Sequence, residues 1–156
     1  MTLVTAESCT GGLIAGRITE VAGSSDVFWG AFVTYSNEAK IKCLHVPENT
    51  LKTCGAVSAE TVCAMTQGAI AVSGASAAIA VSGVAGPGGG SAQKPVGSVW
   101  IGVRLATGEH AERAYTFPPP RENVRNRAAG TALYLMERLV AQGIKALDIP
   151  PPFEYY

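Results

Sequence analysis

Two nucleophiles, Ser8 and Cys9, stand side by side near the start of the chain in the stretch AESCTGG. A short β-rich run at residues 3–6 precedes them and a segment with apolar residues at helical spacing follows, so we expect a strand that turns directly into a helix. Such a turn aims backbone N–H groups and the positive end of the helix dipole at whatever lies above it, which suits an oxyanion or a phosphate. A hydroxyl cap followed by two glycines for a tight turn accounts for the same residues equally well.

Either nucleophile needs a base, and histidine is the usual one. The chain has two histidines, His45 and His110, and neither stands in a recognisable Ser-His-Asp arrangement. Lysine is the remaining option, because a desolvated lysine can lose its proton and act as the base for a serine. Lys40 is the candidate, on an expected short helix at 36–44 just beyond a strand end; a solvated helix lysine is the alternative interpretation.

Other polar residues lie at the ends of expected elements. SGVAGPGGGS, residues 82–91, holds five glycines and could present backbone N–H groups to an anion, although it lacks the lysine-containing end of a P-loop and also fits a flexible turn. Arg121 and Arg125 share one face at the start of the last helix, where arginines suit phosphate or carboxylate but commonly bind nothing. Glu7 is either an exposed edge residue or a buried acid that needs a partner.

The elements that would carry these residues alternate along the chain. Strands are expected at 3–6, 28–35, 75–82, 96–105 and 109–117, with the last two joined as a hairpin. Helices are expected at 12–23, at 36–44, after a Ser58 cap, and at 121–142. Their apolar faces are Leu13, Ile14, Ile18 and Val21; Val62, Met65, Ala69 and Ile70; and Val124, Ala128, Ala132, Leu135 and Leu139. This alternation predicts an α/β layer fold with a mixed sheet.

Length and composition favour one domain, since the chain has 156 residues of which 47% are hydrophobic. We place this domain at 1–142 and expect an irregular, proline-rich tail at 143–156. Twelve basic and twelve acidic residues cancel, which argues against nucleic acid or an anionic membrane as a partner. No apolar run is long enough for a bilayer span and no secretory signal is visible, so we expect a cytoplasmic protein.

The four cysteines form no CxxC pair, and with two histidines a zinc set of normal ligand spacing is hard to assemble. We therefore expect no metal, and reduced cysteines that are mostly buried as small hydrophobes.

Six strings stand in an order and spacing that resemble a known family. They are TAESCTGGLIAGRIT, VAGSS, FVTYSNEAK, GAVSAETV, SGVAGPGGG and KPVGSVW. Together they resemble the C-terminal domain family of the competence/damage-inducible protein CinA, which is similar in turn to the stand-alone nicotinamide mononucleotide deamidases of bacteria. The resemblance implies an α/β fold, a three-layer α/β/α sandwich with a mixed, mostly parallel five-stranded sheet. Family members usually carry an additional helix before the first strand, whereas this sequence opens on the strand.

The same resemblance implies an activity, the hydrolysis of the carboxamide of nicotinamide mononucleotide to give nicotinic acid mononucleotide and ammonia, with no cofactor and no metal. On matching positions Ser8 is the nucleophile, Lys40 is its base, and Tyr35 assists the serine or positions the ring. The expected oxyanion donors are the backbone N–H groups of Cys9, Thr10 and Gly11.

Substrate binding is implied for a second set of residues, namely Ser82, Gly86, Gly88, Gly89, Arg121 and Arg125. Ser82 stands where many members have threonine, and either hydroxyl can donate a hydrogen bond. Arg121 matches an arginine that follows a Gly-Asp pair in many members, whereas three prolines precede it here. The choice between Arg121 and Arg125 as the phosphate ligand therefore stays open.

Two alternatives stay open as well. Cys9 is the alternative nucleophile, because thiolates are intrinsically better attackers. A non-catalytic nucleotide-binding or assembly domain would keep the same fold and loops, although the presence of Ser8, Tyr35 and Lys40 together argues against it. We also expect a homo-oligomer, with Trp29, Phe32 and the tail aromatics assigned either to its interface or to packing.

Overall fold

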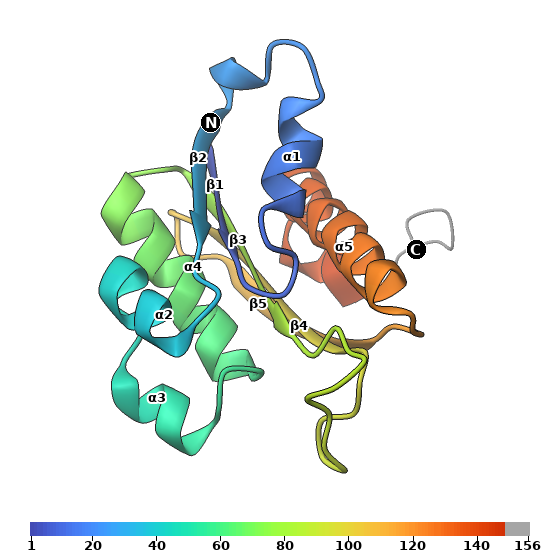
Figure 1. Cartoon of the computed structure of the whole chain (residues 1–156). Coiled ribbons are helices and arrows are strands. Elements are labelled where there is room, and N and C mark those ends of the chain that lie inside the picture. The colour runs from blue at the N-terminus through green and yellow to red at the C-terminus, as the bar shows by residue number, and fades with distance from the viewer. Residues whose placement is uncertain (149–156) are drawn as a thin grey trace.

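A five-stranded sheet forms the middle layer of the computed structural model, which describes residues 1–148 (Figure 1). Its strands are β1 (Leu3–Glu7), β2 (Phe28–Val33), β3 (Ala77–Gly83), β4 (Ser98–Leu105) and β5 (His110–Thr116). Within the described residues their order is β2-β1-β3-β4-β5, and only β4 runs against the other four. The expected mixed, mostly parallel sheet is confirmed.

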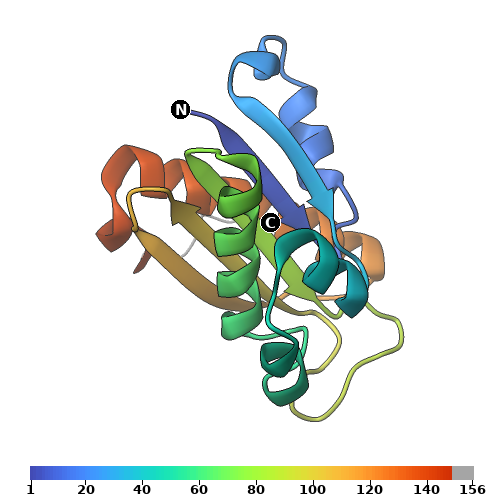
Figure 2. The ribbon, with the colours of Figure 1, turned by 90° about the vertical axis from the view of Figure 1, so that its left-hand side faces the viewer.

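Helices cover both faces of the sheet, as Figures 1 and 2 show from two sides. On one face lie α1 (Leu13–Thr19) and α5 (Arg121–Gln142); on the other lie α2 (Asn37–Leu44), α3 (Glu48–Thr53) and α4 (Ala59–Ser73). Two short 3-10 helices, η1 (Ser24–Asp26) and η2 (Ile144–Asp148), complete the described elements. The three-layer α/β/α sandwich implied by the resemblance is therefore the observed fold.

Local signals explain where these helices begin. The hydroxyl of Ser36 accepts a hydrogen bond from the N–H of Ala39 at 3.1 Å, and that of Ser58 accepts from Thr61 N–H at 3.2 Å, so α2 and α4 both start at a serine cap. Helix α5 starts directly after the three prolines, which cannot continue a ladder. Its predicted core stripe is fully buried: Val124, Ala128, Ala132, Leu135 and Leu139.

The observed elements differ from the expected ones in three places. Helix α1 ends at Thr19, so Val21 lies beyond it and is 64% exposed rather than packed on the sheet. Helix α3 has no counterpart among the expected elements, because its six residues offer too few apolar positions to set a period. The packed body continues past residue 142, since η2 buries Ala146 and Leu147. Residues 149–156 of the expected tail lie outside the described part of the chain.

All four cysteines carry free thiols, but only Cys9 is buried. Cys43 is exposed and Cys54 and Cys63 are half-buried, so the expectation of mostly buried cysteines is wrong. Trp29 stacks on Phe32 at the edge strand β2 and stays half exposed, whereas Phe32 packs against the core. None of the described helices is both long and apolar enough to cross a bilayer.

Gly68 brings α4 against the backbone of α2, because a Cβ at this position would overlap the carbonyl oxygen of Leu44. We expect Gly68→Ala to lower the free energy of unfolding by about 1–3 kcal/mol, the usual cost of overpacking, in urea denaturation.

The control is Gly16→Ala in α1, where an added Cβ meets nothing within 4 Å. It is expected to raise stability by up to about 1 kcal/mol through helix propensity. Equal stability of the Gly68→Ala variant and the wild type would contradict the close approach of the two helices.

Candidate active site

A cavity of about 200 Å³ opens where the carboxyl ends of β1, β2 and β3 meet. Parallel neighbouring strands end at the same edge of a sheet, which is where ligand sites form in α/β folds. The side chains and loops that line the cavity come from segments far apart in the sequence, and its polar lining consists of Ser8, Cys9, Tyr35, Lys40, Ser82 and Arg121. The structure thus brings the three predicted catalytic residues together.

Lys40 projects from α2 into this site and is only 1% exposed. Its Nζ donates to Ser8 Oγ at 3.0 Å, to the carbonyl oxygen of Thr34 at 2.8 Å and to that of Tyr35 at 3.3 Å. All three N–H groups of the ammonium are therefore satisfied. Among residues 1–148 no carboxylate forms an ion pair with this lysine.

Burial lowers the pKa of Lys40 to about 8, and the nearby Cys9 opposes this shift. Desolvation without a counter-ion disfavours the charged form, so the amine loses its proton close to neutral pH. A neutral amine can keep two N–H bonds to the carbonyls of Thr34 and Tyr35 and turn its lone pair toward Ser8 Oγ. The geometry therefore suits a lysine that takes the proton of the serine.

Glu7, whose setting was left open by the sequence, is a fully buried acid with four partners. Its Oε2 accepts from the backbone N–H of Gly12 at 3.0 Å and of Ile14 at 3.1 Å. Its Oε1 accepts from the N–H of Ala15 at 2.9 Å and from the Thr5 hydroxyl at 3.2 Å. The carboxylate therefore caps α1 from inside the protein, and the N–H groups at this helix start are used by Glu7 rather than offered to a ligand.

The turn between β1 and α1 also limits which N–H groups can serve as oxyanion donors. Gly11 N–H donates to the Ser8 carbonyl at 3.0 Å, so the expectation for Gly11 is wrong because its donor is already used. Within residues 1–148 no oxygen accepts from the N–H of Cys9 or Thr10, which leaves two of the three expected donors. Arg125 holds the carbonyl groups of Cys9 and Thr10 in place, because it donates to Cys9 O at 3.2 Å and to Thr10 O at 2.8 Å.

Cys9 is poorly placed to act as the nucleophile. Its side chain is buried, and burial raises the pKa of its thiol to about 11, although its own backbone N–H, Lys40 and Arg125 act in the opposite direction. The reactive thiolate is therefore scarce at neutral pH. Ser8, by contrast, has its hydroxyl in contact with the lysine amine.

Tyr35 and Arg121 lie at the mouth of the cavity. The Tyr35 side chain is 61% exposed and its hydroxyl accepts from Arg121 Nη2 at 3.4 Å, while Arg121 Nη1 donates to the carbonyl of Gly86 at 2.8 Å. Tyr35 thus meets Ser8 and Lys40 through its backbone carbonyl and not through its ring hydroxyl. Of the two candidate arginines, Arg121 lines the cavity and Arg125 braces the turn.

Of the remaining residues predicted to bind substrate, some lie at the cavity and others face the solvent. Ser82 is buried in β3 and lines the cavity, and no group in the described residues bonds its hydroxyl. Gly88 and Gly89 are exposed, Gly86 is buried, and none of the three lines the cavity. Gly86 contributes only through its carbonyl, which accepts from Arg121. The cavity wall includes residues that the sequence did not single out: Ala56, Val57, Gly83 and Ala85. Small apolar residues carry no sequence signal for such a role, because only packing exposes them to the cavity.

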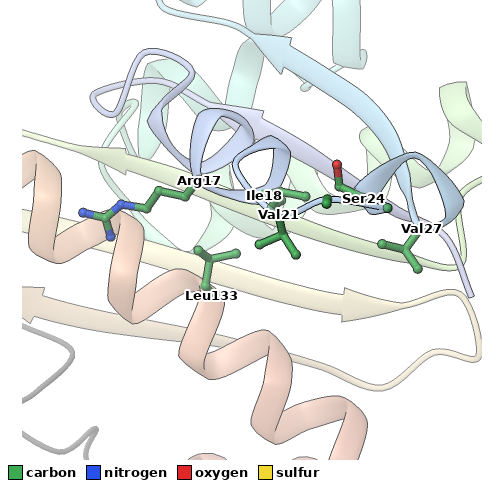
Figure 3. Close-up of a pocket in the computed structure, with 8 residues that line it drawn as sticks. Arg17, Ile18, Val21, Ser24, Val27 and Leu133 are labelled. Carbon is green, nitrogen blue, oxygen red and sulfur yellow. The ribbon is translucent and has the colours of Figure 1, made fainter.

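A larger hollow of about 360 Å³ lies elsewhere, between α1, η1 and α5 (Figure 3). Ile18, Val21 and Leu133 give it an apolar wall, and Arg17 reaches along its rim. Among the described residues that line it, Ser24 has the only hydroxyl, and no base accompanies it because arginine keeps its proton. The smaller cavity is therefore the candidate active site.

Comparison with known proteins identifies the relatives of this chain. Residues 1–140 match the CinA C-terminal domain family. A CinA-like protein of Akkermansia muciniphila is 52% identical over 129 residues, covering 83% of this chain and 31% of the relative. A putative competence-damage inducible protein of Moorella thermoacetica is 48% identical over 138 residues, covering 88% and 33%. The chain spans about a third of the length of the curated relatives it matches.

Solved structures agree with this result. The competence/damage inducible protein CihA from Agrobacterium tumefaciens superimposes with a TM-score of 0.88 at 46% identity, covering 90% of this chain and 86% of that one. A CinA superfamily protein from Escherichia coli gives a TM-score of 0.85 at 33% identity, covering 89% and 80%.

The burial of Cys9 generates a prediction about thiol reactivity. In the native protein near neutral pH, we expect iodoacetamide to modify Cys9 at least about 100-fold more slowly than the exposed Cys43, as followed by peptide mass spectrometry. Unfolding in urea serves as the control, because it should make the two rates similar. Rapid native labelling of Cys9 would reinstate it as a nucleophile.

Proposed function

Because the chain belongs to the CinA C-terminal domain family, we propose that it is a nicotinamide mononucleotide deamidase that releases ammonia from the pyridine carboxamide. The observation that carries the proposal is the contact between Lys40 Nζ and Ser8 Oγ inside a cavity that holds no carboxylate among the described lining residues. A serine paired with a buried lysine is an arrangement for acyl transfer to a hydroxyl. The family match names neither an activity nor a substrate, and both are therefore part of this proposal.

In the first step, neutral Lys40 takes the proton of the Ser8 hydroxyl while Oγ forms a bond to the amide carbon. The carbonyl electron pair moves onto oxygen, and the resulting oxyanion needs hydrogen-bond donors. The N–H groups of Cys9 and Thr10, from which no oxygen in residues 1–148 accepts, are the candidates, and Ser82 offers a further hydroxyl. Loss of one such donor typically costs about 10²–10³ in rate.

In the second step, protonated Lys40 gives its proton to the amide nitrogen as the carbon–nitrogen bond breaks and ammonia leaves. The product is an ester between the pyridine carbonyl carbon and Ser8. Water then attacks this ester with the same lysine as base, which releases nicotinic acid mononucleotide and restores the serine. No metal or cofactor enters these steps.

The dimensions of the cavity favour a small planar group over a whole nucleotide. At about 200 Å³ it falls below the roughly 300–1,000 Å³ of pockets that enclose drug-sized ligands, so we place the pyridine carboxamide inside and the ribose phosphate at the mouth. Arg121 supplies a positive charge there for the phosphate. The exposed ring of Tyr35 offers an aromatic face, which attracts a positively charged pyridinium.

Replacement of the two neighbouring nucleophiles separates their roles. We expect Ser8→Ala to lower kcat for ammonia release from nicotinamide mononucleotide by about 10³-fold or more, because the acyl acceptor is lost. Cys9→Ala, the matched control in the same turn, should keep kcat within about tenfold of the wild type. Turnover by Ser8→Ala with loss of activity in Cys9→Ala would assign the chemistry to the thiol. A wild type that binds the mononucleotide but releases no ammonia would identify a non-catalytic binding domain.

The lowered pKa of Lys40 predicts the pH dependence of the reaction. Because the base must be unprotonated, kcat/KM should fall about tenfold per pH unit below the pKa of about 8 and level off above it. Lys40→Arg keeps a positive charge but cannot lose its proton, so we expect its activity to be at least about 10³-fold lower. The remaining activity of this variant should not show the tenfold fall per pH unit below about pH 8. A rate that is independent of pH between about 6 and 9 would rule out Lys40 as the base.

A further inference from the structure

Cys63, His110 and Glu112 lie close together, away from the candidate active site. The cysteine comes from α4, and the other two come from the edge strand β5. One ligand atom from each side chain, the thiol sulfur, an imidazole nitrogen and a carboxylate oxygen, lies within 4.8 Å of the others. We propose that these three side chains bind a divalent ion of the Zn²⁺ class.

The fold explains why the three side chains meet. His110 and Glu112 are two residues apart in a strand, so they lie on the same face of β5. Helix α4 covers that face at close range, since a Cβ at Gly102 of β4 would come within 3.1 Å of the Val62 carbonyl. Gly102 pairs with Glu112, and this close approach places Cys63, the residue after Val62, above β5.

The distances are near those of a tetrahedral zinc site. With bonds of about 2.0–2.1 Å to nitrogen or oxygen and about 2.3 Å to sulfur, ligand atoms lie roughly 3.3–3.6 Å apart. His110 Nδ1 and Glu112 Oε1 are already 3.1 Å apart. The sulfur has to approach by roughly 1.2–1.5 Å at most, which side-chain rotation can supply. The side chains of His110 and Glu112 are 42% and 17% exposed, so an ion and a fourth, water ligand can enter from solvent.

Arg104 contacts the sulfur of the cluster, and the ligand atoms determine which class of ion fits. The arginine donates from Nη2 to Cys63 Sγ at 3.1 Å and from Nε to Thr66 Oγ1 at 3.2 Å, which holds its charge beside the cluster. The N–H group directed at sulfur favours the thiolate, but burial and Glu112 together raise the pKa of the Cys63 thiol, so a bound ion has to displace the thiol proton. A thiolate with a carboxylate then balances the charge of a divalent ion. Ca²⁺ and Mg²⁺ depend on several oxygen ligands, whereas the cluster offers a single carboxylate. Sulfur and imidazole instead favour Zn²⁺ or Co²⁺.

The proposed metal site is separate from the candidate active site. Arg104 pairs with both His110 and Ala78, near the start of β3, whereas Ser82 of the cavity lies four residues further along that strand. Four residues of strand span about 13 Å. The metal proposal therefore stands independently of the deamidase proposal.

Cobalt binding tests the site because Co²⁺ takes the place of Zn²⁺ and reports its ligands by absorption. The full chain is reduced, treated with a chelator, desalted and titrated with Co²⁺. We expect one ion per chain, a near-ultraviolet sulfur-to-cobalt charge-transfer band, visible bands of a tetrahedral ion, and displacement by Zn²⁺. Cys63→Ser should lose the near-ultraviolet band and bind at least about 10–100-fold more weakly, and His110→Gln should weaken binding at least as much, since even outer-sphere changes cost that amount.

Cys43→Ser is the matched control, because Cys43 is an exposed cysteine on α2, outside the cluster, and its replacement should leave the spectrum and the affinity unchanged. Thermal melting of the metal-free variants shows whether each is folded. The proposal is overturned if the wild type shows no sulfur-to-cobalt band, if Cys63→Ser keeps it, or if folded Cys63→Ser and His110→Gln bind as tightly as the wild type.

Discussion

The buried ammonium of Lys40 constrains the arrangement of the strand ends around it. A charge removed from water without a carboxylate is costly unless every N–H finds an acceptor, and here the carbonyls of Thr34 and Tyr35 and the hydroxyl of Ser8 supply the three. These acceptors can converge because β1 and β2 are parallel neighbours that end at the same edge. The incomplete compensation that lowers the pKa of Lys40 also leaves the amine able to accept a proton. The burial of Lys40 therefore costs folding free energy, and the same burial makes the amine a base.

The neighbouring residues Glu7 and Ser8 have opposite tasks because side chains alternate along a strand. Glu7 faces the α1 layer and caps the start of that helix, whereas Ser8 faces the cavity. Arg125 completes the support by holding the carbonyls of Cys9 and Thr10, so the peptide groups next to the nucleophile are fixed while their N–H groups stay available. A carboxylate and an arginine outside the cavity thus position a serine inside it.

Most of the fold follows from local patterns in the sequence. The helix at 121–142 was predictable to the residue because an unbroken apolar stripe starts after three prolines. The serine caps of α2 and α4 likewise mark their starts. Helix α3 and η2 escaped prediction, since such short segments have no period and are ordered by contact with the rest of the chain. The close packing at Gly68 and Gly102 depends on which helix lies across each glycine, and that is a property of the assembled layers.

The candidate site shows the same division. The sequence by itself determined which elements carry Ser8 and Lys40, because strand and helix periods and capping residues act over a few neighbours, and the family resemblance supplied their roles. Only the tertiary structure decided that Arg121 lines the cavity, that the N–H of Gly11 is already used, and that Cys63 of α4 meets two side chains of β5. The first and the last of these facts are contacts between segments that are remote in the chain, and such contacts exist only once the strand order and the packing of the helices are set. The bond from Gly11 N–H to Ser8 is local, and it depends on a turn geometry that the residue types alone do not fix.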